Sequence, residues 1–153
     1  MVRMILCVAL ASCAVATMPA AVEAAAPRQY YSNWRAHPRK AYHYRVYYYK
    51  PKPDYSGYRH HYVIHHPRYP RYHYFYNPYK KRYWGRCPVQ TGGRSLYSRL
   101  PDNLQRQSLA DIPDTAFPAP GPAPAIPEST DGIPLDLPPD DLPPDLSGVP
   151  EGG

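Results

Sequence analysis

The sequence predicts a mostly disordered chain with a small all-β element. An antiparallel meander of three or four tyrosine-rich strands is followed by a short helix and a proline-rich, acidic, disordered tail. Leu, Ile, Val and Phe supply 25 of the 153 residues, below the roughly one-fifth share that a packed core usually has. All 17 Tyr precede position 98 and 13 of the 22 Pro follow position 100, so the β-prone and strand-breaking residues are separated along the chain.

The first element, residues 1–26, has the form of a signal peptide. An apolar stretch of small residues follows Arg3 and ends in a small-residue cleavage site near Ala26. A retained transmembrane anchor and lipoprotein cleavage at Cys13 are the alternatives. After cleavage we expect an exported protein, in the periplasm, at the cell surface or outside the cell, with no membrane span. Cys87 is then the single cysteine, and we expect a free thiol rather than an intermolecular link.

The next two elements are a basic linker and the meander. Residues 27–41 are rich in Arg and polar residues, and residues 42–88 are rich in Tyr, His and Arg. In the second range, aromatic and β-branched runs alternate with turn-forming Pro, Asp, Asn and Gly, which is the pattern of antiparallel strands. The expected strands are 42–49, 59–66, 71–76 and 81–86. Conventional core residues are few, so we expect the meander to be only marginally stable by itself. A partner surface or self-association would then stabilise it further.

The last two elements are a second linker and the tail. Residues 89–112 are predicted to contain a short helix from Pro101 to Ala110, because Leu recurs there at near-helical spacing. Residues 113–153 are predicted to be an acidic, extended, solvated tail, since Pro at every few positions blocks helix and sheet.

The charges are divided between the two halves of the chain. Residues 27–99 carry a net charge of +15 and residues 100–153 a net charge of −9. We expect the basic half to bind an anionic envelope polymer, itself, or its own acidic tail. Tyr interleaved with Arg also suits single-stranded nucleic acid, but an exported protein would bind it only in the test tube. The candidate polymer-binding surface is Tyr44, Tyr48, Tyr72, Tyr74, Tyr76, Tyr83, Trp84, Arg71, Arg82 and Arg86.

The histidines are candidate metal ligands, because neutral imidazole binds copper, zinc and nickel. His60 and His61 precede a short strand core, His65 and His66 follow it, and His73 lies on the next strand. A separation of four strand residues is about 13 Å, too far for one ion unless the chain bends. We therefore assign no cofactor, and keep a metal or haem carrier as an alternative. Protonation of the seven histidines below about pH 6 is expected to strengthen polyanion binding.

Motifs for catalysis are missing from the sequence. It contains no glycine-rich phosphate loop, no paired cysteines for zinc and no Gly-x-Ser-x-Gly turn. Preorganised catalytic groups also need a rigid scaffold, which this composition does not predict. We therefore expect a non-enzymatic structural or interaction protein.

Two segments resemble known proteins. The stretch 74–77, followed by Trp84 and Pro88, resembles the second hairpin of WW domains, which implies binding of proline-rich peptides by a surface containing Tyr74, Tyr76 and Trp84. Most of the chain after position 26 is similar to uncharacterised exported proteins of planctomycete-type bacteria. The shared segments are Tyr76-Asn77-Pro78, Tyr83-Trp84-Gly85-Arg86, Asp111-Ile112-Pro113 and Phe117-Pro118-Ala119-Pro120-Gly121. The second resemblance implies export and no particular activity.

Overall fold

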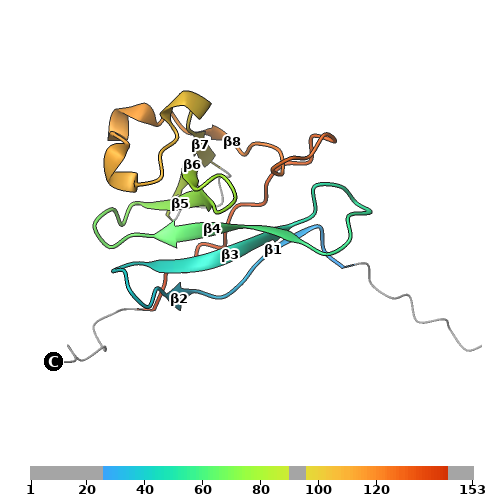
Figure 1. Ribbon diagram of the computed structural model, residues 1–153, viewed down its shortest axis with the longest axis horizontal. Helices are drawn as coiled ribbons and strands as arrows, with labels where there is room; N and C mark the ends of the chain where they lie inside the picture. Colours follow the sequence, from blue (N-terminus) through green and yellow to red (C-terminus); the bar gives the residue numbers. More distant parts are fainter. Residues whose placement is uncertain (1–25, 90–95, 145–153) are drawn as a thin grey trace, which may run out of the picture.

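The computed structural model describes residues 26–89 and 96–144. Its regular structure is mostly β-strand, arranged as one curled antiparallel sheet (Figure 1). The strand order is β1-β3-β4-β5-β6-β7-β8, and β2 also pairs with β3. The strands are β1 (Gln29–Tyr31), β2 (Arg35–Ala36), β3 (His43–Tyr49), β4 (Arg59–His65), β5 (Tyr72–Asn77), β6 (Arg82–Pro88), β7 (Leu96–Arg99) and β8 (Gly121–Pro122).

The predicted meander is confirmed as β3, β4, β5 and β6, each within two residues of its expected bounds. The turn between β5 and β6 shows how local residues make the chain reverse direction. The Asn77 side-chain oxygen accepts hydrogen bonds from the backbone N–H groups of Tyr79 and Lys80, as Asn commonly does in turns. Lys81 then takes a positive φ of 52°, and a register shift follows next to Tyr76.

Alternation of side chains divides the sheet into two faces. We call them the covered face and the tyrosine face. The covered face includes Tyr47, Val63, Phe75, Trp84 and Tyr97. The tyrosine face carries most of the remaining rings of β3 to β6: Tyr44, Tyr48, Tyr62, Tyr72, Tyr74, Tyr76 and Tyr83.

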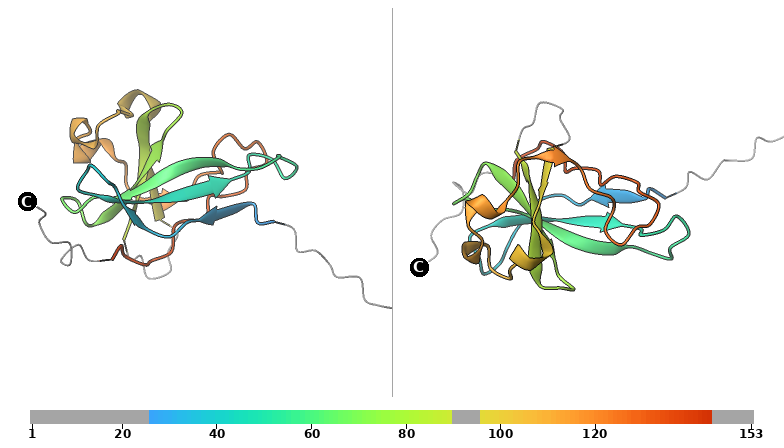
Figure 2. Two further views of the ribbon diagram at one scale, coloured as in Figure 1. Left: turned by 60° about the horizontal axis from the view of Figure 1, so that its bottom comes forward. Right: turned by 90° about the horizontal axis from the view of Figure 1, so that it is seen from above.

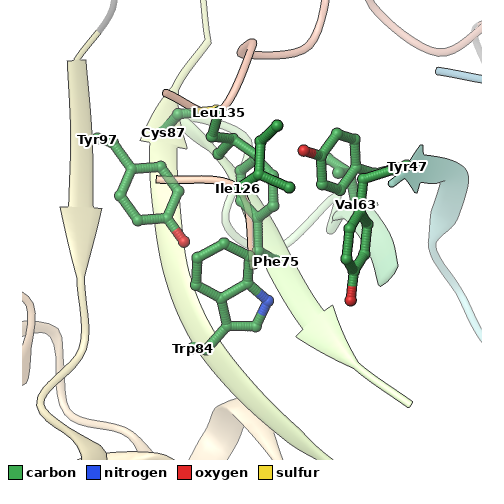
Figure 3. Close-up of a cluster of buried hydrophobic side chains, with 9 residues drawn as sticks. Tyr47, Val63, Phe75, Trp84, Cys87, Tyr97, Ile126 and Leu135 are labelled. Carbon is green, nitrogen blue, oxygen red and sulfur yellow. The ribbon is translucent and has the colours of Figure 1, made fainter. Parts of the chain in front are cut away.

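The covered face is closed by residues 121–144, which we call the strap. Ile126 and Leu135 are 1% and 2% exposed and lie among the sheet's buried rings (Figure 3). Two backbone hydrogen bonds, from Ile126 to Ile133 and from Leu135 to Pro124, hold them in a small loop. The expectation of a solvated, disordered tail is therefore not confirmed for residues 113–144. Proline prevents regular structure here, but it does not prevent apolar side chains from packing.

A second segment, residues 100–117, covers part of the tyrosine face. Leu100, Ile112 and Phe117 are buried against Ile64, Tyr74 and Tyr83. The two segments lie on opposite sides of the sheet (Figure 2).

The predicted helix from Pro101 to Ala110 is not formed. Within the described residues the helical structure is three short 3₁₀ turns, at Asp102–Leu104, Leu109–Asp111 and Asp114–Ala116. The carbonyl of Arg106 accepts a hydrogen bond from the backbone N–H of Tyr83 in β6, so the middle of the segment bonds to the sheet rather than to itself.

The remaining expectations concern the two linkers and the termini. Residues 27–41, expected to be a linker, contribute β1 and β2, and the expected linker 89–112 contributes β7. The predicted signal peptide up to residue 25, the part of the second linker at 90–95 and the end of the tail, 145–153, lie outside the described residues. Among the described residues, no helix is long and apolar enough to cross a membrane.

Candidate functional site

Two adjoining hollows lie on the tyrosine face, beside the segment 100–117. The first has a volume of about 370 Å³ and the second, a shallower one, about 690 Å³. They share Lys40, Tyr42, Tyr83 and Gln107, so they lie side by side, and we call the two hollows together the tyrosine groove. Its lining residues are His37, Pro38, Lys40, Ala41, Tyr42, Tyr44, Tyr62, Ile64, His66, Arg68, Tyr69, Tyr76, Tyr83, Gln107, Ser108, Leu109, Ala110 and Asp111.

The floor of the groove is built by tyrosines from four neighbouring strands. Tyr44 of β3 meets Tyr62 of β4 with ring centroids 5.6 Å apart and planes at 90°. Tyr76 of β5 meets Tyr83 of β6 at 5.0 Å and 68°. These edge-to-face contacts favour a fixed arrangement of the rings. The groove therefore has a largely preformed aromatic floor.

Three hydroxyl groups in the groove, those of Tyr42, Tyr76 and Tyr83, are protonated at neutral pH. Burial raises the pKa of Tyr42, Tyr76 and Tyr83 above the usual value, and neighbouring phenols raise those of Tyr42 and Tyr83 further. Each hydroxyl can then both donate and accept a hydrogen bond. The floor thus offers polar groups as well as apolar ring faces.

The rim of the groove is basic. Lys40 and Arg68 are exposed, and neither forms an ion pair with any described residue. The Lys40 ammonium group lies 5.8 Å from the centre of the Tyr42 ring, where a cation is attracted by the ring face. The His37 ring is 4.8 Å from Tyr42. Asp111 is the single acidic residue that lines the groove.

The predicted polymer-binding residues divide between several environments. Tyr44, Tyr76 and Tyr83 line the groove, and Tyr48 lies farther along the same face. Tyr72 and Tyr74 are also on this face, but Tyr74 is buried. Arg71 is in the turn before β5, and Arg82 begins β6.

Arg86 is not free to bind a polymer. Its guanidinium group lies between the rings of Tyr72 and Phe117, at 3.8 Å and 4.0 Å from their centres. It also forms an ion pair with Asp114. This arginine therefore fixes the segment 100–117 to the sheet.

Trp84 lies on the covered face, packed between Phe75 and Tyr97 (Figure 3). Tyr74 and Tyr76 belong to the opposite face. The three residues do not form the single surface that the WW-like interpretation requires. The register shift beside Tyr76 explains this, because it turns Tyr83 to one face and Trp84 to the other.

The five candidate metal ligands do not converge. His60 is on the tyrosine face, whereas His61, His65 and His73 are on the covered face. Only His65 and His73 meet, with ring centroids 5.3 Å apart. His66 follows the end of β4. Over residues 26–89 and 96–144, no three His, Cys, Asp or Glu side chains are placed to hold one metal ion.

Burial changes the expected acid response of the histidines. Burial, together with smaller effects of nearby His and Arg charges, lowers the pKa of His61 and of His73 to about 3. The pKa values of His65 and His66 are also lowered, mainly by burial. The expectation that all seven histidines gain charge below about pH 6 is therefore wrong for the two most buried of these rings. Cys87 is a free, buried thiol whose pKa burial raises to about 12.

The basic rim was not predicted from the sequence. His37 and Lys40 fall in the stretch expected to be a linker, and Arg68 falls in a turn. The sequence feature that marks this place is Pro38, a turn-forming residue. In the structure the chain reverses direction around it, and the backbone N–H of His37 donates a hydrogen bond to the carbonyl of Tyr42. Comparison of the chain with family models, curated proteins and solved structures finds no match.

Proposed function

We propose that the protein is an exported, non-enzymatic binding protein that holds an anionic envelope polysaccharide in the tyrosine groove. The observation that carries this proposal is the combination of an aromatic floor with a basic rim. A polyuronate, whose sugar rings each carry a carboxylate, matches both features. In this proposal the sugar rings would stack on the tyrosines, and the carboxylates would lie near Lys40 and Arg68, which line the groove.

The distribution of ion pairs supports an anionic ligand. Three arginines of the sheet and its edge are neutralised by acids of the strap on the covered face. These pairs are Arg28–Asp131, Arg45–Asp141 and Arg59–Glu128. The strap therefore offsets the charge of the covered face. On the tyrosine face Arg86 is paired with Asp114, but Lys40 and Arg68 at the groove are left without an ion pair among the described residues. A basic cleft of this kind attracts anionic ligands and speeds their association.

The shape and chemistry of the groove support a polymer rather than a small molecule. Sites for small molecules usually enclose most of the ligand surface, whereas this groove consists of two open hollows that lie side by side. Tyrosine suits such a surface because it offers a large ring at low entropic cost together with a hydroxyl group. An extended chain of sugars can therefore contact several rings in succession.

The test is a pair of charge reversals measured with polygalacturonate. In Lys40→Glu the reversal is at the groove rim, and in Lys52→Glu it is in the turn 50–57, where the side chain is also exposed. Both variants have the same net charge. We expect Lys40→Glu to weaken binding of residues 27–153 much more than Lys52→Glu, in calorimetry at low ionic strength.

The control ligand is dextran, a neutral polysaccharide, measured at the same low ionic strength. Dextran binding that equals polygalacturonate binding would contradict the need for an anionic ligand. Equal losses in the two variants would show that net charge alone, rather than the groove, attracts the polymer. Neither substitution is in the core, and circular dichroism checks that both variants keep the sheet.

A further inference from the structure

Tyr30 and Tyr48 form a stacked pair at the edge of the sheet. They are register partners across β1 and β3, and their ring centroids are 4.8 Å apart with planes inclined by only 19°. Tyr30 is 40% exposed. This pair lies on the tyrosine face but outside the groove.

The other stacked tyrosine pairs of the described residues are shielded from solvent. Tyr31 stacks on Tyr47, and Tyr47 stacks on Tyr49, but Tyr47 and Tyr49 are both fully buried. The remaining contacts between two tyrosines within the described ranges place one ring edge against the other ring face, as Tyr58 does with Tyr30. Tyr30 and Tyr48 therefore combine close, nearly parallel rings with access to an oxidant.

We propose that Tyr30 and Tyr48 are a site of intramolecular dityrosine formation, driven by hydrogen peroxide with a haem peroxidase. Each phenol loses one electron and one proton and becomes a phenoxyl radical. The two radicals join through a carbon–carbon bond between ring positions next to the hydroxyls. The hydrogen on each joined carbon then moves to the oxygen and restores the phenol. Hydrogen peroxide accepts the two electrons and two protons and becomes two molecules of water.

The strand pairing supplies the geometry that this coupling needs. Because β1 and β3 hold the two rings side by side, the radicals meet without diffusion, which strongly favours an intramolecular reaction. The product ties β1, a three-residue edge strand, to the meander by a covalent bond. It closes a loop that includes β2, and thereby restricts the unfolded chain as other cross-links do.

The experiment oxidises dilute protein, residues 27–153, with hydrogen peroxide and a plant haem peroxidase. Dityrosine fluorescence follows the reaction, and fragmentation mass spectrometry locates the link. We expect a monomeric product that is lighter by two hydrogen atoms and that joins Tyr30 to Tyr48. A principal link between other tyrosines, such as Tyr30 to Tyr58, would overturn the proposal, as would a product that is mainly dimeric at high dilution.

Matched variants separate this pair from general tyrosine oxidation. Tyr30→Phe and Tyr48→Phe keep both rings and the strand pairing, and each is expected to lose the cross-linked product. Tyr55→Phe is the control, because Tyr55 is 38% exposed and makes none of the ring contacts found in the described residues. Loss of the product in Tyr55→Phe, or its retention in Tyr30→Phe, would show that the stacked pair is not the site.

Discussion

The two faces of the sheet are built from similar residues but are completed differently. On the covered face, the strap adds Ile126 and Leu135 to the rings and brings acids to three arginines. On the tyrosine face, the segment 100–117 covers only one end, and the groove beside it stays open and basic. The difference shows how one chain of opposite charges makes both a core and a ligand surface. The strap neutralises arginines of the covered face, whereas on the tyrosine face Arg86 is paired with Asp114 and the cations at the groove rim stay free to bind.

Among the single substitutions, the largest expected effect comes from removing apolar contact between the strap and the sheet. Ile126→Ala should lower the free energy of unfolding by about 2–5 kcal/mol, the usual cost of truncating a buried aliphatic side chain. Ile133→Ala is the matched control, because Ile133 belongs to the same strap loop and is 43% exposed. It should change the free energy of unfolding by less than about 0.5 kcal/mol. Urea unfolding followed by Trp fluorescence measures both.

A strap that is solvated, as the sequence alone predicts, would give equal and small effects in these two variants. That outcome would remove the distinction between the faces.

The same strap shows what the sequence could and could not predict. The meander was predictable because strand and turn signals are local: Val63 and Ile64 lie in a β-prone run, and Asn77-Pro78 marks a turn. The strap was not, because Ile126 and Leu135 are single apolar residues between prolines, with no period to reveal which face they cover. Their burial depends on contacts with β3 to β6, far away in the sequence.

The groove was only partly predictable for a related reason. Tyr44 and Tyr76 could be recognised as aromatic residues on strands. Whether such a residue is exposed depends on which other segment of the chain packs over its face of the sheet, and the strand pattern does not show that. The segment 100–117 buries Tyr74 and Arg86 and leaves Tyr44 and Tyr76 in the groove. Lys40 joins them through the reversal that precedes β3. Tertiary packing, rather than residue type, therefore decides which predicted residues are available to a ligand.

The second prediction concerns the most buried ion pair of the covered face. The Arg45 guanidinium group binds both carboxylate oxygens of Asp141, at 2.9 Å and 2.6 Å, and lies 4.4 Å from the centre of the Trp34 ring. Arg45 is 3% exposed, whereas Asp141 is 53% exposed. Asp141→Asn leaves the guanidinium buried with weaker partners, so the free energy of unfolding should fall by about 1.5 kcal/mol, the low end for charged hydrogen bonds.

Asp140→Asn is the control for the loss of one acid, because Asp140 forms none of the ion pairs of the described chain. A loss in Asp140→Asn as large as in Asp141→Asn would mean that the strap is attracted by its total charge. The bidentate pair would then have no special role.

The third prediction is a loss of stability on mild acidification, caused by the covered face. His61 and His73 have pKa values of about 3 in the folded chain, against about 6.5 when unfolded. Between these values the unfolded chain binds the extra protons, so the free energy of unfolding falls as the pH decreases below about 6.5. Each histidine contributes about 1.4 kcal/mol per pH unit. Arg28 and Arg86 lower the pKa of Asp131 and Asp114, so these carboxylates stay ionised down to about pH 4.5.

His73→Phe tests the assignment of this slope. Both His73 ring nitrogens lack a hydrogen-bond partner among the described residues, and the ring stacks on Trp34 at 5.1 Å, so a phenylalanine ring would lose no hydrogen bond and could keep the stacking. In this variant, the free energy of unfolding should depend less steeply on pH between pH 6.5 and pH 4.5, because about one proton fewer is taken up on unfolding. The variant should also be at least as stable at pH 7, because a buried polar group without a partner is removed. An unchanged slope would show that His73 is protonated in the folded chain.

The smallest expected effect is found by comparing two arginines on opposite faces, the half-buried Arg59 and the exposed Arg68. Arg59 pairs with Glu128 of the strap at 2.8 Å, whereas Arg68 lines the groove without an ion pair among the described residues. Arg59→Gln should lower the free energy of unfolding by about 0.2–1 kcal/mol, the range for exposed pairs, and high salt should reduce that difference. Arg68→Gln should leave stability unchanged and weaken polygalacturonate binding. The reverse result, with Arg68 affecting stability and Arg59 affecting binding, would mean that the strap screens the ligand surface and the groove is structural.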